Sequence, residues 1–225
     1  DVYKRQAKMS VSIGDLAFAF GETLYMTLLS TLVAYAIGLP IGIGLIITDK
    51  NGLRPMRVLN AVLGIIVNIL RSIPFLILLI AIMPFTRLIT GTTIGSVATI
   101  VPLTVAAAPF VARMVESSLK EVDPGVVEAA QSMGASTWKI VWSVFLKEGK
   151  PSLIVGSAIA LGTILGYSAM AGIVGGGGLG AIAINYGYYR GDSQTMLITV
   201  VLLVVIVQIL QEVAMFIART RDRRL

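Results

Sequence analysis

The chain has 225 residues, of which 56% are hydrophobic and only 13% are charged, and its mean hydropathy is +0.88. A soluble domain carries about a quarter charged residues, so the composition excludes an ordinary soluble domain and indicates a membrane protein. The absence of Cys and His excludes disulfides, thiol nucleophiles, Cys/His metal sites and histidine acid–base chemistry. The net charge of +6 is compatible with nucleic-acid binding or with contact to anionic lipid, and the positions of the basic residues distinguish the two.

The N-terminal part combines a polar start with the first long apolar run. Residues 1–19 are expected to form an N-terminal segment whose first residues need not be native. Residues 9–23 are mildly amphipathic, and we predict a surface segment there because Asp15 and Glu22 interrupt the apolar pattern. Residues 24–47 contain no charge. Since a bilayer core of about 30 Å needs about 20 helical residues, residues 24–47 predict a transmembrane helix.

Two glycines inside this first span have the spacing of a helix-packing motif. Gly38 and Gly42 form G-x-x-x-G around Pro40. Small residues at this spacing allow a second helix to approach closely. Chance is the rival interpretation in a chain with 23 glycines, and the sequence leaves both open.

The second apolar run is too long for one upright helix. Residues 58–86 are apolar except for Arg71 and would extend about 44 Å as a single helix. We predict one long or broken helix, with Pro74 near the break and Pro84 near the far end, because a proline removes a helical hydrogen bond. Three further spans are predicted at residues 94–112, 152–174 and 193–211, followed by a basic tail at residues 219–225.

The basic residues favour one orientation of these five spans. If the polar loop at residues 122–147 lies inside, twelve Lys and Arg residues lie on the inner side and five on the outer side. Because basic loops stay in the cytoplasm, we expect the N-terminus outside and the C-terminus inside. The positive charge is then explained by topology and anionic lipid, and no nucleic-acid partner is expected.

The polar loop at residues 122–147 has the pattern of two short helices joined by a turn. Asp123 can cap the first helix, and Pro124 suits its first position. Gly134 is expected to end it as a left-handed residue, and Ser136 or Thr137 can cap the second helix. Helical spacing places four apolar residues on one side of the first helix. They are Val126, Val127, Ala130 and Met133.

This loop resembles the EAA loop of ABC-importer permeases. The resemblance rests on Glu128-Ala129-Ala130, on Gly134 and on the apolar group Val144-Phe145-Leu146 at the family spacing. The family pattern ends in Leu-Pro, whereas here Lys147 follows Leu146 and Pro151 comes four residues later. The resemblance implies that the loop forms coupling helices that dock on a cytoplasmic ATPase. The residues that it assigns to this coupling are Asp123, Pro124, Glu128, Ala129, Ala130, Gly134 and Trp138.

A narrower resemblance, to permeases of methionine importers, extends over nearly the whole chain beyond about residue 20. It rests on five short runs, at residues 71–75, 83–87, 167–172, 177–180 and 185–188. It implies an all-α polytopic fold of the ABC type-1 permease class, with the permease domain at residues 20–218. It also implies a homodimer in the bacterial inner membrane, a separate ATPase that binds ATP, no cofactor in this chain, and an extracytoplasmic substrate-binding lipoprotein or periplasmic protein.

Five residues are candidates for the translocation path or its gate. Tyr167, Ser168, Met170 and Asn185 are polar or soft residues near the outer end of a span, where small neighbours permit helix movement. The alternative is that Ser168 bonds to its own helix and Met170 faces lipid or core. Arg71 can attract a substrate carboxylate, pair with a helix-end carbonyl, or extend to the inner interface.

Residues 175–180 formally match the dinucleotide pattern G-x-G-x-x-G, but that site needs a preceding strand and a following helix. This run follows a transmembrane span, so we predict a tight or re-entrant turn. No span contains paired carboxylates, and every lysine lies in a loop or tail, so no catalytic residue is expected. Two alternatives to methionine import stay open: a permease of this fold for another small solute, and an ATP-independent channel or structural membrane protein.

Overall fold

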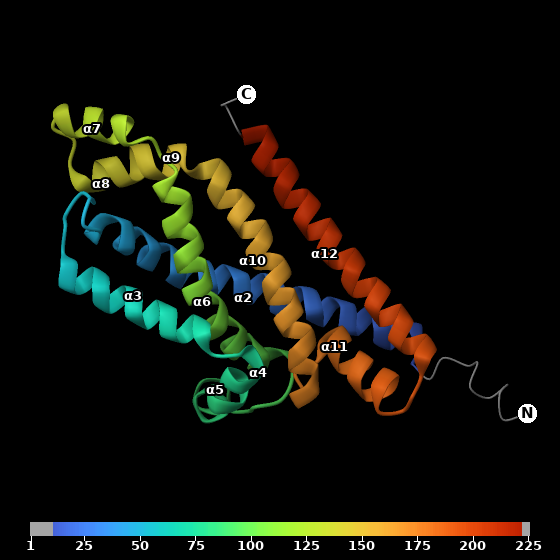
Figure 1. Ribbon diagram of the computed structural model, residues 1–225. Helices are drawn as coiled ribbons and strands as arrows, with labels where there is room; N and C mark the ends of the chain where they lie inside the picture. Colours follow the sequence, from blue (N-terminus) through green and yellow to red (C-terminus); the bar gives the residue numbers. More distant parts are fainter. Residues whose placement is uncertain (1–10, 222–225) are drawn as a thin grey trace, which may run out of the picture. The chain divides into compact units, whose positions relative to one another are not determined.

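The computed structural model describes residues 11–221, and within this range every regular element is a helix (Figure 1). The predicted all-α class is thus confirmed. The four long helices are α2 (Ile13–Thr48), α6 (Ser96–Lys120), α10 (Lys150–Ala171) and α12 (Ser193–Arg221). The shorter ones are α3 (Arg57–Ser72), α4 (Phe75–Ala81), α5 (Met83–Thr90), α7 (Pro124–Ser132), α8 (Thr137–Ile140), η1 (Val141–Phe145), α9 (Leu146–Glu148), η2 (Gly172–Val174), α11 (Gly178–Ile182) and η3 (Ala183–Tyr188). The extreme ends of the two predicted terminal segments, residues 1–10 and 222–225, lie outside the described range.

Among the described residues, four helical segments are long and apolar enough to cross a membrane: Ile13–Thr48, Ser96–Lys120, Lys150–Val174 and Ser193–Thr220. The bent pair α3 and α4 makes a fifth if it counts as one span. The two helices meet at 100°, which confirms the predicted break at Pro74. Ile73 adopts an extended conformation with φ −80° and ψ 122°, because proline disfavours helical geometry in the residue before it.

The first helix begins earlier than predicted. Residues 13–23 were expected to form a surface segment, but they continue α2 without a break. Ser12 and Asp15 form a reciprocal cap, in which Ser12 Oγ accepts from the Asp15 amide at 3.1 Å and Asp15 Oδ2 accepts from Ser12 Oγ at 2.8 Å. Glu22 accepts a hydrogen bond from the amide of Gly178 at 2.9 Å. Both carboxylates are therefore satisfied inside a helix that they were expected to interrupt.

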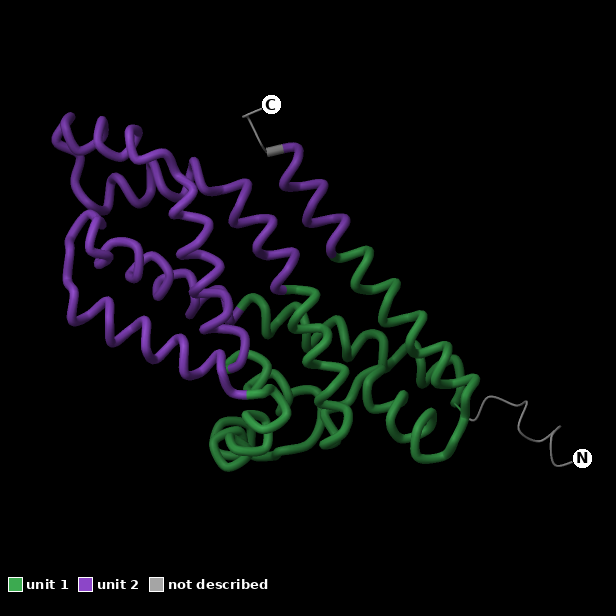
Figure 2. The backbone as a smooth tube through the Cα atoms, viewed as in Figure 1, with its two compact units in different colours: residues 1–32, 74–105, 161–210 green, residues 33–73, 106–160, 211–225 purple. Residues whose placement is uncertain are grey.

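The chain forms two compact units, which Figure 2 colours separately. The described part of the first unit comprises residues 11–32, 74–105 and 161–210. Its core contains Val11, Leu16, Ala19, Leu165, Leu179 and Ile206. The second unit comprises residues 33–73, 106–160 and the chain from 211 onward, and Leu45, Val67 and Ala112 form its core. The long helices contribute residues to both units.

In the second unit, the two glycines of the G-x-x-x-G motif lie against α6. A Cβ atom at Gly38 would come within 2.8 Å of the Ala108 carbonyl oxygen, and one at Gly42 within 2.6 Å of the Ala112 carbonyl oxygen. Such distances leave no room for a methyl group without movement of the α6 backbone. The close-approach interpretation of the motif is therefore correct.

In the first unit, the glycine run forms the predicted tight turn. Gly175, Gly177 and Gly178 have φ values of 80°, 81° and 70°, a region that other residues rarely adopt. Thr99 Oγ1 donates to the Gly176 carbonyl at 3.1 Å, which ties the turn to α6. The turn thus brings the short helix α11 back onto the end of α10, and a Cβ atom at Gly172 would overlap the backbone of Gly180.

Candidate functional site

Loop 122–147 has the predicted local structure. Asp123 Oδ1 accepts from the amide of Gly125 at 2.7 Å, and Pro124 opens α7. Gly134 follows the C-cap with a φ of 76°, as expected for a left-handed helix end. Of the two candidate caps for the second arm, Ser136 is the one used, because its Oγ accepts from the amide of Lys139 at 3.3 Å. The second arm continues as α8, η1 and α9 to Glu148.

The apolar residues of this loop divide into a buried and an exposed set. The buried residues of the second arm, which belongs to the second unit, are Ile140, Val141, Val144 and Phe145. The four residues predicted on one side of α7 do not share one environment. Ala130 is buried and Val127 is half-buried, whereas Val126 and Met133 are exposed.

Several large apolar side chains of loop 122–147 therefore face outward. We call them the exposed apolar set: Val126, Met133, Trp138 and Trp142, with 44%, 80%, 67% and 65% of their surface accessible. Ala129 is exposed as well. Aromatic residues and methionine are enriched in protein–protein interfaces, so this set has the composition of a docking surface. The sequence analysis assigned Trp138 to the coupling residues but gave no docking role to Val126, Met133 or Trp142, although both tryptophans of the chain lie here.

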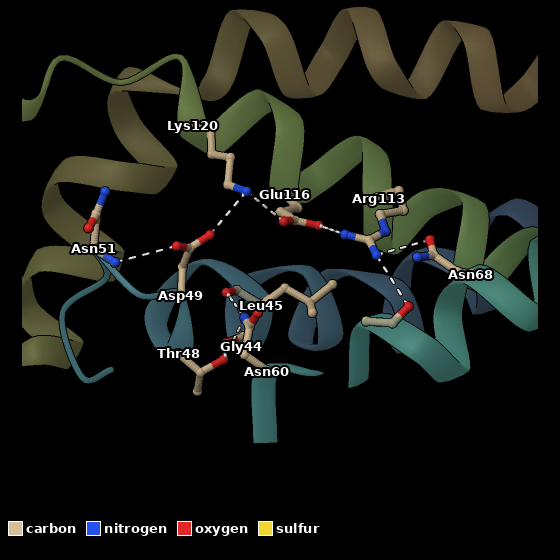
Figure 3. Close-up of polar contacts among 11 residues, drawn as sticks. Gly44, Leu45, Thr48, Asp49, Asn51, Asn60, Asn68, Arg113, Glu116 and Lys120 are labelled. Carbon is tan, nitrogen blue, oxygen red and sulfur yellow. Dashed lines mark hydrogen bonds and ion pairs between the residues drawn. The ribbon is translucent and has the colours of Figure 1, made fainter. Parts of the chain in front are cut away.

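A polar ladder joins the turn directly after α2 to α6 and α3 inside the second unit (Figure 3). Asp49 Oδ2 lies 3.2 Å from Lys120 Nζ, which lies 2.7 Å from Glu116 Oε1. Glu116 Oε2 accepts from Arg113 Nη1 at 2.6 Å. Arg113 Nη2 in turn donates to Asn68 Oδ1 at 3.0 Å and to the Gly64 carbonyl at 3.2 Å. Burial raises the pKa of Asp49, but hydrogen bonds and the charge of Lys120 outweigh it, so the pKa lies below its usual value.

The two carboxylates of this ladder, Glu116 in its middle and Asp49 at one end, should contribute unequally to stability. Glu116 is 7% exposed and binds two cationic side chains, so we expect Glu116→Gln to lower the free energy of unfolding by about 1–3 kcal/mol. Asp49 is 26% exposed at its side chain, so Asp49→Asn should cost less than about 1 kcal/mol. Thermal unfolding of the two purified variants in one detergent measures both. Equal losses would contradict this ranking.

The gate candidates occupy different surroundings. Tyr167 stacks on Phe75, with ring centroids 4.5 Å apart and planes within 4°. Ser168 is 1% exposed and donates to the carbonyl of Leu165 at 2.7 Å, so its hydroxyl bonds to its own helix. Met170, at the end of the same helix, is 40% exposed. The aromatic pair was not foreseen from the sequence, because 92 positions separate its two members.

Asn185 and Arg71 complete the candidates. Asn185 is exposed within η3. Arg71 is exposed in the last turn of α3 and lines a cavity of ≈330 Å³ with residues of α6 and α10. A second missed feature is a clamp on the glycine turn, in which Thr23 Oγ1 accepts from the amide of Leu179 at 2.9 Å, beside the Glu22 contact. The only sequence signal for this clamp was an acidic residue next to a long apolar run.

Comparisons with known proteins agree over most of the chain. Residues 38–225 match the family model of the binding-protein-dependent transport system inner membrane component. The chain is 51% identical to the probable D-methionine transport system permease protein MetI of Vibrio cholerae, over 93% of both chains. It is 41% identical to the methionine import system permease protein MetP of Bacillus subtilis, over 96% of this chain and 97% of the relative.

The solved structures give the same result. The chain superposes with a TM-score of 0.94 and 44% identity on a chain of the MetNI methionine ABC transporter in inward-facing conformations, covering 96% of this chain and 100% of that one. A chain of an amino acid ABC transporter crystallised with histidines superposes with a TM-score of 0.69 at 20% identity, over 94% of this chain and 100% of that one. The second likeness concerns the fold alone.

Proposed function

The chain belongs to the family of binding-protein-dependent transport system inner membrane components, and on that premise we propose that it is the membrane-spanning permease of an ATP-driven methionine importer. The observation that carries the proposal is the superposition on the MetNI chain over 96% of the sequence. This family is one of transporters rather than enzymes, so the chain moves its substrate and leaves hydrolysis to another subunit. The fold is that of an ABC type-1 permease.

Loop 122–147 is the proposed attachment point of the ATPase that binds ATP. Its exposed apolar set offers a surface from which a docked ATPase would exclude water. Its buried residues connect this surface to the rest of the second unit and would transmit movement there. A short rigid element suits this task because Asp123, Gly134 and Ser136 fix both helix ends. Movement of the loop would then alternately open the path near Tyr167, Ser168, Met170 and Asn185 to each side of the membrane, with Arg71 on the same path.

The remaining partners follow from the same assignment. The permease works as a homodimer with two copies of the ATPase, and a substrate-binding lipoprotein or periplasmic protein delivers methionine from outside. The family is placed in the inner membrane, where this chain spans the bilayer several times. The proposed orientation has the N-terminus outside and the C-terminus inside, and the excess of basic residues on the side of loop 122–147 supports it.

Methionine uptake into proteoliposomes tests the function. The vesicles contain this chain with its ATPase and capture protein, and uptake of labelled methionine is measured with and without ATP. We expect uptake that requires all three components and ATP. ATP hydrolysis stimulated by the capture protein without methionine uptake would indicate a permease for another solute, and passive flux through this chain alone would indicate a channel.

A further inference from the structure

A groove with both polar and apolar walls runs between α6 and α10 in the second unit. One cavity of ≈330 Å³ has Arg71 and Arg113 in its wall. A neighbouring cavity of ≈360 Å³ reaches Glu148, at the end of the second arm of the loop. The two cavities share the wall residues Ser118, Glu121, Ser152 and Val155. They therefore lie side by side, and we call them together the α6–α10 groove, which has Arg71 in the wall of one cavity and Glu148 in the wall of the other.

The Arg71 end of this groove carries an uncompensated positive charge. Arg113 is neutralised by Glu116 at 2.6 Å and holds Asn68 through a second nitrogen. Arg71 lies about one turn beyond Asn68 on α3, and no hydrogen bond or ion pair joins it to another residue within 11–221. A guanidinium in an apolar run is stable only if it meets water or an anion.

The position of Arg71 weighs against the simplest alternative, in which its side chain extends to the interface. About 21 Å of helix separate Arg71 from Arg57 at the start of α3. An arginine side chain cannot extend over that distance to reach the interface where α3 begins. The guanidinium of Arg71 therefore stays beside the cavity, and an anionic group of a ligand in the cavity would neutralise its charge.

The rest of the cavity wall suits a small amphipathic solute. Ser117 and Ser152 offer hydroxyl groups, Glu121 offers a carboxylate that suits the ammonium group of an amino acid, and Phe110, Met114 and Ile159 offer apolar surface. The volume lies at the lower end of the range of small-molecule sites, about 300–1,000 Å³. We propose that the Arg71 end of the α6–α10 groove binds the α-carboxylate of the translocated amino acid, while the apolar wall receives its side chain. This inference rests on the proposed function, because it takes methionine as the substrate.

Equilibrium binding to the assembled permease–ATPase complex tests the site. Saturation-transfer NMR on nucleotide-free complex in lipid nanodiscs measures L-methionine, L-methioninol, which lacks the carboxylate, and acetate. We expect methionine binding that Arg71→Gln weakens about tenfold or more, as for the loss of a charge-assisted hydrogen bond. Arg71→Lys should bind more tightly than Arg71→Gln but more weakly than the unchanged chain, because lysine keeps the charge and loses the planar fork of the guanidinium. Arg57→Gln is the matched control, the same substitution on the same helix, and should leave binding unchanged.

Each other outcome overturns the inference. If Arg71→Gln binds methionine as the unchanged chain does, any binding belongs to another site of the complex. If methioninol binds equally well, the carboxylate is not recognised, and if acetate binds as tightly as methionine, the site is a simple anion site. Uptake in proteoliposomes is measured in parallel. Absence of methionine uptake by the unchanged complex would refute the proposed function, whereas normal uptake with normal binding by Arg71→Gln would refute only this site.

Discussion

Ala129→Arg should abolish ATP-dependent uptake while leaving the permease folded. Ala129 is exposed on α7, next to buried Ala130, so the longer side chain projects from the loop without disturbing its inner packing. In the assembled transporter it would place an unpaired charge in the docking surface. A buried unpaired charge costs about 3 kcal/mol or more, which corresponds to roughly hundredfold weaker docking. Uptake and ATPase stimulation in proteoliposomes measure the loss.

Two variants make this expectation specific to docking. Ala130→Arg places the same side chain at a position that is 7% exposed, so it should destabilise the permease itself. Trp138→Ala removes an indole that is 67% exposed, so it should spare stability but cost about 2 kcal/mol or more of docking, as expected of an interface tryptophan. If Ala129→Arg takes up methionine as the unchanged chain does, even at low ATPase concentration, loop 122–147 is not the docking site of the ATPase.

Local chemistry explains what the sequence could predict. The caps at Asp123 and Ser136 and the glycine at 134 act within three or four residues, so their pattern is readable without a fold. The break at Pro74 is local in the same sense, because proline restricts the residue that precedes it. The long apolar runs likewise predicted the spans, since bilayer thickness sets their length.

Long-range contacts explain what the sequence could not predict. Glu22 was expected to interrupt the apolar pattern of a surface segment, but it accepts a hydrogen bond from the amide of Gly178, 156 positions away. The polar ladder joins Asp49, Arg113 and Asn68 only because three helices meet there. Exposure is equally non-local: Ala130 and Met133 share one side of α7 by spacing, yet only the first faces the unit. The spacing of apolar residues shows which side of a helix they share, but only the segments packed around the helix determine whether that side is buried.

The close packing of α11 on α10 leads to the second large expected effect, which concerns Gly180. A Cβ atom at Gly180 would overlap the carbonyl oxygen of Ala169, a backbone atom that cannot rotate away. Gly180→Ala must therefore push α11 off the end of α10, where Ser168 and Met170 lie. We expect a loss of about 3 kcal/mol in unfolding free energy, at the upper end for an overpacked core. Thermal unfolding and methionine uptake of the variant measure the two consequences.

A matched control separates this clash from the general effect of adding a methyl group. Gly21 lies inside α2 in the same unit, and a Cβ atom there meets nothing within 4 Å. Gly21→Ala should stabilise the chain by up to about 1 kcal/mol, because alanine favours a helix over glycine. If Gly180→Ala instead matches Gly21→Ala in stability and uptake, the tight packing of α11 is not required, and the path can open without movement at this contact. A loss confined to Gly180→Ala indicates that the glycine turn fixes the C-terminal end of α10. This helix carries the gate candidates Tyr167, Ser168 and Met170.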